Sequence, residues 1–456
     1  MSNFAGGLVS FLVLLLLLAL RVPIGVAMLA VGAGGFIWIQ GLGPLLSFLK
    51  TTPFETFAGY SFSVIPLFLL MGNVASGSGL SARLFRGANA LLGHHRGGMA
   101  MAAVGACAAF GTICGSSLAT AATMGQVALP EMRKYGYSGA LATGTLAAGG
   151  TLGILVPPSI PLVVYAILTE QNIAKLFLAA FIPAGLAVIG FFIAIRGYIY
   201  FYPDSGPATE KLPLAERARR VGETWPVIAI FLVVFVGMNG DFFLGRSLFT
   251  PTEGAAIGAL LATIAALTVG GMRWRAVFGS VRATAEQSGM IFLILLGAEL
   301  YNAFLARTNM PQVAAQWVAG LGISPYLVMA VIVVIYILLG CLMDSLSMIL
   351  LTIPIFFPVV MGLDFGLTPE HTAIWFGILA LIVVELGLIH PPVGLNVYVI
   401  QNIAGDVSML ETFKGVVQLS GFANSQAEIS KAVQLARDVN GVKSVKNDIR
   451  LKSSSS

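Results

Sequence analysis

Charged residues are scarce in this sequence. Of its 456 residues only 10% are Asp, Glu, Lys or Arg, whereas 57% are hydrophobic. Soluble domains carry roughly 25% charged residues, and a chain this apolar could not cover its own surface in water. The scarcity of charge therefore excludes an ordinary water-soluble enzyme and indicates a protein that crosses a membrane several times.

Cysteine and histidine are also rare, with three and four residues. The cysteines Cys107, Cys114 and Cys341 lie in apolar surroundings and have neither the number of a disulfide framework nor the spacing of a zinc site. The sequence shows no Ser-His-Asp arrangement, no histidine cluster and no phosphate loop. We therefore expect no catalytic residues and no transition metal. No basic cluster interleaved with aromatic residues points to nucleic acid, and the net charge of +5 is explained by basic loops on one side of a membrane.

The apolar segments are continuous, as in residues 7–20 (GLVSFLVLLLLLAL). Outer-membrane barrels alternate apolar and polar residues instead, so the sequence predicts an all-α polytopic membrane protein. The segments lie near residues 5–20, 24–40, 61–79, 98–130, 139–168, 174–196, 225–240, 253–270, 287–305, 325–361 and 371–403.

Two of these segments are predicted to be re-entrant hairpins, because each is too long for one span of about 20 residues. Segment 98–130 has basic residues beyond both ends and a small, polar centre around Gly115, Ser116 and Ser117. Segment 325–361 has the same build, with the centre GCLMDSLSM at residues 340–348. No basic residue flanks the second segment closely. We expect it to enter from the opposite face of the membrane.

Each predicted hairpin precedes a long apolar segment with a Pro-Pro pair. Residues 152–168 read LGILVPPSIPLVVYAIL, and residues 386–402 read LGLIHPPVGLNVYVIQN. Adjacent prolines remove backbone donors and break a helix. A hairpin followed by a broken helix, found twice with opposite entry sides, predicts inverted repeats, which are typical of transporters.

The distribution of basic residues sets the orientation. With the N-terminus outside, fifteen Lys and Arg residues lie in inner loops, and only Lys50, Lys175, Arg246 and Arg307 remain outside. This bias favours a periplasmic N-terminus. The main cytoplasmic loop is then 200–224, whose charged ERARR stretch is predicted to be a helical connector.

The hairpin centres supply oxygen ligands at membrane depth. The hydroxyls of Ser116, Ser117, Thr120, Ser345 and Ser347 and the carboxylate of Asp344 suit an alkali cation such as Na⁺, and the nearby helix ends favour an anionic substrate. Asp344 is the strongest candidate for a Na⁺ ligand, since a carboxylate inside a membrane normally has either a charged or hydrogen-bonding partner or a functional role. The alternatives are a structural pair for Asp344 and close helix packing for the tip serines.

Two further polar residues flank the second Pro-Pro pair. Glu385 precedes it by six residues and either positions the break or has a structural hydrogen-bonding role. His390 is either proton-sensitive or a simple hydrogen-bonding residue.

Several long motifs carry a resemblance to a known family. They are IPLFLLMGNVASGSGLS (65–81), FGTICGSSLATAATMGQVALPEM (110–132), GTLGILVPPSIPLVVYA (150–166), FTPTEGAAIGA (249–259), LARTNMPQ (305–312) and ELGLIHPPVGLNVYVIQNIAG (385–405). Over about residues 1–416 the chain resembles the large membrane subunit, of DctM type, of tripartite ATP-independent periplasmic (TRAP) transporters.

The resemblance implies a Na⁺-driven secondary transporter of the elevator type, with the architecture of the ion transporter superfamily, in the bacterial inner membrane. The implied partners are a small four-helix membrane subunit of DctQ type and a periplasmic binding protein of DctP type that delivers organic acids such as C4-dicarboxylates. The implied Na⁺ ligands, Na⁺ being the coupling ion, are Gly115, Ser116 and Ser117 with Gly153 and Pro157, and Asp344, Ser345 and Ser347 with Gly387 and Pro391. The residues assigned to substrate or partner are Thr120, Ser159, Asn396, Arg307 and Glu253.

The resemblance to DctM ends near residue 416, where a final apolar span is expected but a polar stretch follows. Residues 416–452 resemble the strand–helix–strand second half of a BON domain, a small α+β fragment, and 453–456 are a serine tail. The predicted division is thus a transporter subunit over 1–415, lacking its last span, and this partial module. Two functions remain as alternatives to a TRAP transporter subunit. One is a self-sufficient Na⁺/dicarboxylate symporter, and the other is a non-transporting membrane anchor for the BON-like module.

Overall fold

The computed structural model describes residues 3–240, 242, 245–320, 322–341 and 343–420. Within these ranges the regular structure is helical, from α1 (Asn3–Ala19) to α21 (Met409–Ser420). Four of the described helices are individually long and apolar enough to cross a membrane, or up to seven if each bent pair counts as one span. The predicted all-helical class is confirmed for this part of the chain.

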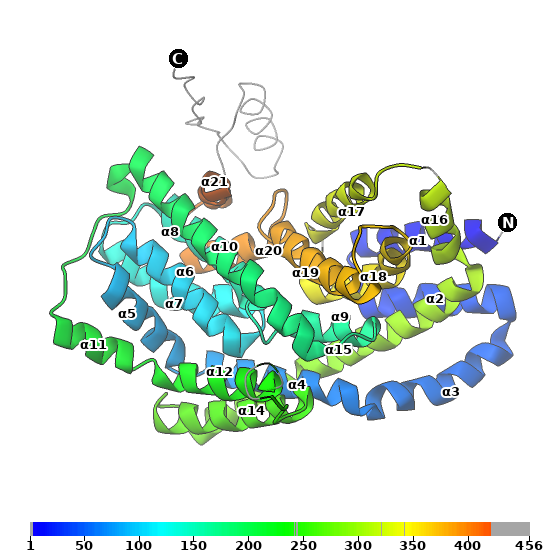
Figure 1. The fold of residues 1–456 in the computed structure, drawn as a ribbon, viewed down its shortest axis with the longest axis horizontal. Helices are drawn as coiled ribbons and strands as arrows, with labels where there is room; N and C mark the ends of the chain where they lie inside the picture. Colours follow the sequence, from blue (N-terminus) through cyan, green and yellow to red (C-terminus); the bar gives the residue numbers. More distant parts are fainter. Residues whose placement is uncertain (1–2, 241, 243–244, 321, 342, 421–456) are drawn as a thin grey trace, which may run out of the picture.

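Two helical hairpins form around the polar centres of the two long segments. The first consists of α6 (Gly98–Cys114) and α7 (Ser117–Lys134), and the second of α17 (Pro325–Gly340) and α18 (Ser345–Met361). Both turn within a few residues. The hairpins lie in opposite halves of the molecule (Figure 1).

Each hairpin is followed by an interrupted helix. The first interruption separates α8 (Gly139–Leu155) from α9 (Ile160–Leu168), which are bent by 42°. The second separates α19 (Pro369–Gly387) from α20 (Leu395–Ala404). The Pro157–Pro158 and Pro391–Pro392 peptide bonds are both cis. After each break the chain crosses to the other hairpin, since α9 packs on α18 while α20 packs on α7 and α8.

The remaining helices surround this centre (Figure 1). They are α2 (Ile24–Gln40), α3 (Leu42–Ala58), η1 (Tyr60–Ser63), α4 (Val64–Ser76), α5 (Leu80–Leu92), α10 (Ile173–Phe201), η2 (Pro203–Ser205), α11 (Leu214–Gly222), α12 (Trp225–Met238), α14 (Pro251–Thr268), α15 (Trp274–Thr308) and α16 (Met310–Gly320).

The outer helices pack backbone to backbone through glycines. A Cβ atom on Gly32 of α2 would lie 2.9 Å from the backbone nitrogen of Tyr301 in α15, and one on Gly297 of α15 would lie 2.7 Å from the carbonyl oxygen of Gly25. Such small residues let membrane helices approach closely where burial of apolar surface gives little driving force. The backbones of α2 and α15 are therefore closely packed against each other.

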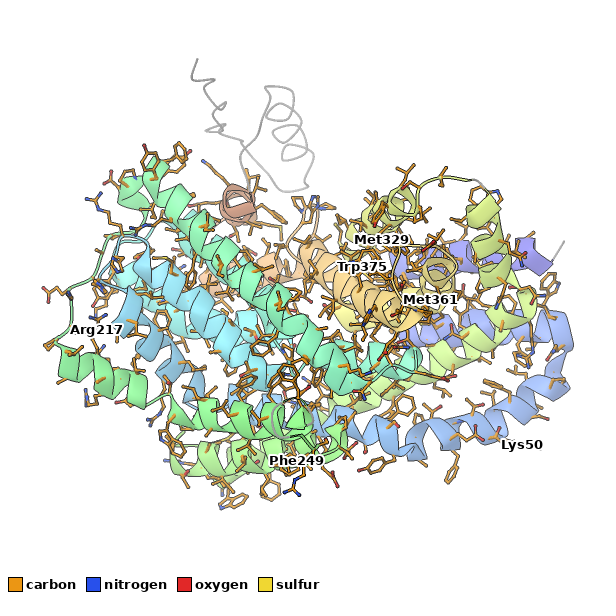
Figure 2. All side chains as sticks on the ribbon, in the orientation of Figure 1. Lys50, Arg217, Phe249, Met329, Met361 and Trp375 are labelled. Atoms are coloured by element: carbon orange, nitrogen blue, oxygen red, sulfur yellow. The ribbon has the colours of Figure 1, made fainter. Side chains whose placement is uncertain are left out.

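Helix α3 was not among the apolar segments expected from the sequence. Its residues include Lys50, Pro53 and Glu55, which lower the local hydropathy below that of its neighbours. The helix nevertheless forms, and it continues into η1 and α4 with a bend of 50°. Figure 2 shows Lys50 at the opposite end of the molecule from Arg217 on α11.

The charged loop contains the predicted connector helix, α11. Glu216 accepts hydrogen bonds from Arg219 (2.8 Å) and Arg220 (2.9 Å), three and four residues further along. Pairs at these spacings lie on one helix face and stabilise it. The helical interpretation of the ERARR stretch is confirmed.

The C-terminal helix α21 packs against α8. A Cβ atom on Gly415 would lie 1.9 Å from the carbonyl oxygen of Ala140, so only glycine fits there. Residues 416–420 continue this helix, and Val416 is buried against the core. The expected strand at the start of the BON-like segment is therefore wrong for these residues. The rest of that segment, 421–452, and the serine tail lie outside the described residues.

Candidate functional site

The tip of the first hairpin is built by a glycine and two serines. Gly115 has a left-handed backbone with φ of 63° and ends α6 by donating its N–H to Gly111; glycine adopts this conformation without strain. Ser116 is extended and caps α7, with its Oγ accepting from Ala119 N at 3.4 Å. Ser117 then starts the helix with its side chain buried.

The tip of the second hairpin is built around Asp344. The Asp344 carboxylate caps α18 by accepting from the Ser347 N–H at 3.2 Å and from the Ser347 hydroxyl. A carboxylate is favourable here because the N-terminus of a helix carries partial positive charge. Asp344 thus has a structural role, and its predicted role as a Na⁺ ligand stays a prediction.

The two tips meet at Glu385, in the last turn of α19. The Ser117 hydroxyl donates to Glu385 Oε2 at 2.5 Å, and the Ser345 hydroxyl donates to Oε1 at 2.7 Å. The Glu385 side chain is only 3% exposed, and none of the ion pairs among the described residues includes it. One buried carboxylate therefore joins hairpins from opposite halves of the chain. The hydrogen-bonding role that the sequence offered as one alternative for Glu385 is confirmed, with one partner in each hairpin.

Each tip lies directly against its own break. A Cβ on Gly153 would lie 2.3 Å from Thr120 Oγ1, and a Cβ on Gly387 would lie 2.6 Å from the Cα of Gly340. A Cβ on Gly115 would lie 3.3 Å from the Pro158 carbonyl oxygen. At the second break, the Cys341 thiol donates to the Pro391 carbonyl oxygen at 3.3 Å. Each hairpin tip thus packs on the break of its own repeat, while the predicted Na⁺-ligand sets stay a prediction.

Three buried polar groups near the breaks lack a partner among the described residues. They are Thr120 Oγ1, Ser159 Oγ and Asn396 Oδ1, and each of these residues is at most 1% exposed. Asn396 reaches from α20 to the first repeat, where its Nδ2 donates to Ala147 O at 3.4 Å. Buried polar atoms are normally hydrogen-bonded, so these three atoms are exceptions; the assignment of their residues to substrate stays a prediction.

Sequence comparison identifies the family. The profile described as "Tripartite ATP-independent periplasmic transporter, DctM component" matches residues 11–425. The chain belongs to the DctM family of TRAP transporters. A second profile, the BON domain, matches residues 401–453, which confirms that resemblance in the C-terminal segment.

Curated relatives of this DctM chain are transporter subunits. The C4-dicarboxylate TRAP transporter large permease protein DctM of Pseudomonas aeruginosa is 37% identical over 77% of this chain and 79% of its own. The sialic acid large permease protein SiaM of Vibrio cholerae is 28% identical over 88% and 91%. The isethionate permease protein DctMQ of Oleidesulfovibrio alaskensis is 28% identical over 85% of this chain and 59% of its own. The chain is therefore a transporter component and not an enzyme.

A solved structure shares the fold. The YdaH transporter of Alcanivorax borkumensis superposes with a TM-score of 0.58, covering 91% of this chain and 95% of its own at 14% sequence identity. The DctM chain thus has the fold of a helical membrane transporter.

Two residues assigned to substrate or partner from the DctM resemblance make local contacts, and that assignment stays a prediction. Glu253 forms a capping box at the start of α14, accepting from the Thr250 N–H at 2.8 Å and from its hydroxyl at 2.9 Å. Arg307 donates to Ala303 O at 2.7 Å, and its guanidinium lies 4.4 Å from the centre of the Phe36 ring. The structure therefore does not tie either side chain to the hairpin tips.

Sequence reasoning missed two features of the DctM site. The backbone partners of the break glycines were not singled out: a Cβ on Gly111 would lie 2.8 Å from the Cα of Gly153, and Gly340 packs on Gly387. The bridging position of Glu385 was also missed. Its signal was a lone carboxylate in the last turn before a break, but its partners lie in two other segments.

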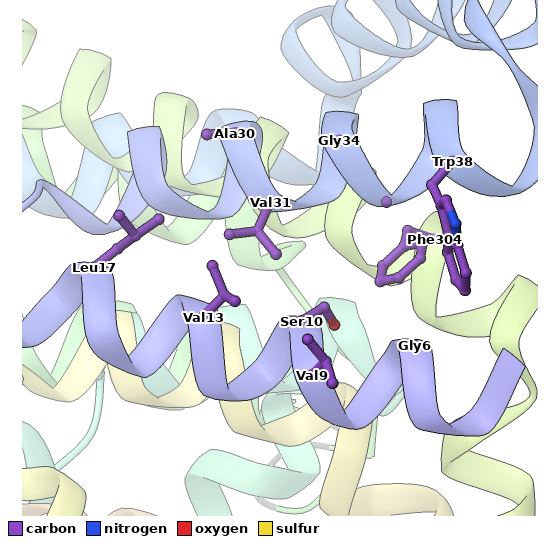
Figure 3. Close-up of a pocket in the computed structure, with 11 residues that line it drawn as sticks. Gly6, Val9, Ser10, Val13, Leu17, Ala30, Val31, Gly34, Trp38 and Phe304 are labelled. Carbon is purple, nitrogen blue, oxygen red and sulfur yellow. The ribbon is translucent and has the colours of Figure 1, made fainter. Parts of the chain in front are cut away.

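A cavity of about 450 Å³ lies away from this site, between α1 and α2 (Figure 3). Its walls include Val9, Val13 and Val31, with Trp38 and Phe304 at one end. Ser10 brings a hydroxyl, but that group already donates to Gly7 O at 2.6 Å. The cavity has no charged lining residue and does not form part of the candidate site of this DctM chain.

Proposed function

We propose that this DctM chain forms the translocation path of a Na⁺-coupled secondary transporter that imports organic acids. The observation that carries the proposal is the Glu385 carboxylate shared by Ser117 and Ser345. It places two interrupted stretches of backbone, rich in oxygen atoms, at one protected point. Discontinuous helices that meet in this way bind ions and substrates in secondary transporters.

The two tips supply the ligands that Na⁺ prefers. Hydroxyl, carbonyl and carboxylate oxygens replace the hydration shell of an alkali cation. In the first site these come from Gly115, Ser116 and Ser117 with the Gly153 and Pro157 backbone. In the second they come from Asp344, Ser345 and Ser347 with the Gly387 and Pro391 backbone. Because Glu385 contacts a serine of each set, an ion bound at one tip changes the hydrogen bonding at the other.

The substrate is a carboxylate held beside these tips. Helices α7 and α18 both begin at the site, and their N-terminal N–H groups favour a negative charge. Thr120 Oγ1, Ser159 Oγ and Asn396 Oδ1 add buried polar atoms that have no hydrogen-bond partner among the described residues. C4-dicarboxylate and sialic acid, named for the P. aeruginosa and V. cholerae relatives, are both acids of this kind.

Transport follows an elevator movement of two inverted repeats. The Ser117–Glu385–Ser345 bridge ties both hairpins into one body, and the glycine contacts between α2 and α15 hold two of the outer helices closely together. Sliding this body against the outer helices opens the site to each side in turn. Both halves carry a hairpin followed by a Pro-Pro break, which supports the repeat.

The protein resides in the bacterial inner membrane with its N-terminus in the periplasm. The excess of basic residues in the loops assigned to the cytoplasm supports this orientation. Its partners are a small four-helix membrane subunit of DctQ type and a periplasmic binding protein of DctP type. The family description names one component of a tripartite transporter, which fits two partners.

Uptake in proteoliposomes tests the proposal. The full chain is reconstituted with the two partner proteins, and an inward Na⁺ gradient is imposed at constant membrane potential. We expect uptake of the acid with Na⁺ and none with K⁺. Ser116→Ala and Asp344→Asn should each lower uptake at least tenfold, and asparagine still caps α18. Ser47→Ala, a serine on α3 outside the site, serves as the matched control.

Three outcomes would contradict parts of the proposal. Equal uptake with Na⁺ and K⁺ would exclude Na⁺ coupling. Unchanged uptake in both tip variants would exclude these ligands. Uptake without the binding protein would favour a self-sufficient symporter instead.

A further inference from the structure

A groove outside the translocation site runs between α10 and the α5–α6 corner. It has a volume of about 410 Å³ and five apolar lining residues: Leu92, Met101, Ile189, Phe192 and Ile193. Ile189 and Ile193 are more than half exposed, so the groove opens on the surface that α10 turns outward. Helix α10 packs along α6 in this region (Figure 1).

The lining changes from apolar to basic toward one end. On α10, Ile189, Ile193 and Arg196 lie four and then three residues apart, which places them on one helix face. On the other wall, Met101 lies within α6, and His95 precedes the start of that helix. Arg196 and His95 therefore mark the same end of the groove, and no acidic residue lines it.

The basic end is held in place by backbone contacts. The Gly97 N–H donates to Gly206 O at 2.8 Å, and the Thr209 N–H donates to Gly93 O at 2.9 Å. A Cβ on Gly97 would lie 2.8 Å from Ile199 Cγ1, so the turn carrying His95 is seated directly on α10. The spacing between the two basic side chains is thus set by the fold.

Among the residues that the structure describes, Arg196 has no acidic partner. It is exposed, and none of the salt bridges or side-chain hydrogen bonds among the described residues includes it. This differs from Arg133, Arg219, Arg220 and Arg282, which each pair with a carboxylate. A guanidinium has a planar set of donors that matches the oxygens of a phosphate group.

We propose that this groove binds an anionic phospholipid. One acyl chain lies along Ile189, Phe192 and Ile193, and the phosphate is bound by Arg196 and by the His95 ring. Basic pockets between membrane helices bind anionic headgroups in this way. The cavity between α1 and α2 offers a contrast, because it has apolar walls without a basic residue and so no anchor for a headgroup (Figure 3).

Native mass spectrometry of the delipidated full chain tests this site. The protein is titrated with phosphatidylglycerol and phosphatidylcholine that carry identical acyl chains. We expect the wild type to bind phosphatidylglycerol at lower concentration. Arg196→Gln should weaken that binding about fivefold, as expected for the loss of one cation near a headgroup, and should leave phosphatidylcholine unchanged. Arg275→Gln is the control and should retain the preference, because Arg275 is another exposed arginine without a salt bridge in the described part of the chain.

A second variant tests the acyl chain. Ile189→Asn places a polar group in the apolar part of the groove and should weaken both lipids together. Because Ile189 and Arg196 are exposed, both variants should melt at the wild-type temperature without lipid, which confirms that they fold. A wild type without preference for phosphatidylglycerol would overturn the proposal, because an arginine that merely extends to the membrane surface selects no lipid. A preference that survives Arg196→Gln, or that Arg275→Gln reduces equally, would overturn it too.

Discussion

The Ser117 hydroxyl lies 2.5 Å from Glu385 Oε2, although the two residues come from different halves of the chain. Ser117 begins the second helix of the first hairpin, and Glu385 lies in the last turn of the helix before the second break. The same carboxylate also accepts from Ser345. One acidic side chain at the centre of the protein thus accepts hydrogen bonds from both hairpins. Neither half of the chain supplies both donors alone.

Replacing Glu385 should separate its structural role from its charge. Glu385→Ala leaves two buried hydroxyls without an acceptor, which we expect to lower the free energy of unfolding by about 1–3 kcal/mol. Glu385→Gln keeps the shape and one acceptor oxygen, so it should melt closer to the wild type while still reducing uptake. Thermal unfolding in detergent and uptake in proteoliposomes measure the two effects.

The control for Glu385 is Glu370→Gln on the same helix. Glu370 is half exposed and pairs with Lys175 at the surface, so its loss should change neither measurement. If Glu385→Gln transported as well as Glu370→Gln does, the negative charge would have no part in transport.

Because the contacts at the breaks are so close, we expect a single added methyl group there to destabilise the protein strongly. Gly387→Ala forces a Cβ to 2.6 Å from the Gly340 Cα, and Gly153→Ala forces one to 2.3 Å from Thr120 Oγ1. Overpacking of this kind should destabilise each variant by about 1–3 kcal/mol. Gly190→Ala in α10 has no heavy atom within 4 Å and should be neutral or slightly stabilising. Equal melting temperatures for all three variants would show that the tips are not packed against the breaks.

Exchanging Na⁺ for K⁺ should lower the melting temperature of the wild type. A ligand that binds only the folded state at 100 times its Kd adds about 2.7 kcal/mol of stability. Asp344→Asn should lose much of this difference, whereas Ser47→Ala should keep it. A scan at constant ionic strength separates Na⁺ binding from general salt effects, and a wild type that melts equally in both salts would exclude binding at the tips.

Glu253 provides a test of an assignment that came from the family resemblance. If its role is the capping box with Thr250, Glu253→Gln should retain both stability and uptake, because glutamine serves in a capping box as glutamate does. Glu253→Ala should melt lower than either. A Glu253→Gln variant that folds normally but fails to take up substrate would instead assign the charge to substrate or partner binding.

The sequence predicted local features of the fold well. The apolar segment at 24–40 became α2 with the same limits, and both Pro-Pro pairs interrupt helices where they were expected. These features depend on hydropathy and on the missing donors of proline, which are properties of neighbouring residues. Helix α3 was missed because the charged residues Lys50 and Glu55 lower the mean hydropathy of its segment.

Contacts between distant segments could not be predicted in the same way. Asp344 was predicted to be a Na⁺ ligand, with a structural pair to a neighbouring helix as the alternative; its partner in the structure is Ser347, three residues away in the same hairpin. Glu385 had two partners, each in a different hairpin. Both cases depend on how helices pack, and no spacing within one segment encodes that information.

The crossing of α20 onto α7 and α8 has a consequence for how the protein is made. The ribosome releases α7 and α8 long before Asn396 and the rest of α20 exist, so the first interrupted helix enters the membrane without the segment that completes its packing. The hydroxyl-rich first tip likewise has no Glu385 to accept its hydrogen bond. During insertion the early half must therefore keep its broken backbone near water or another protein. The final shape of the first half is reached only when nearly the whole transporter part has been synthesised.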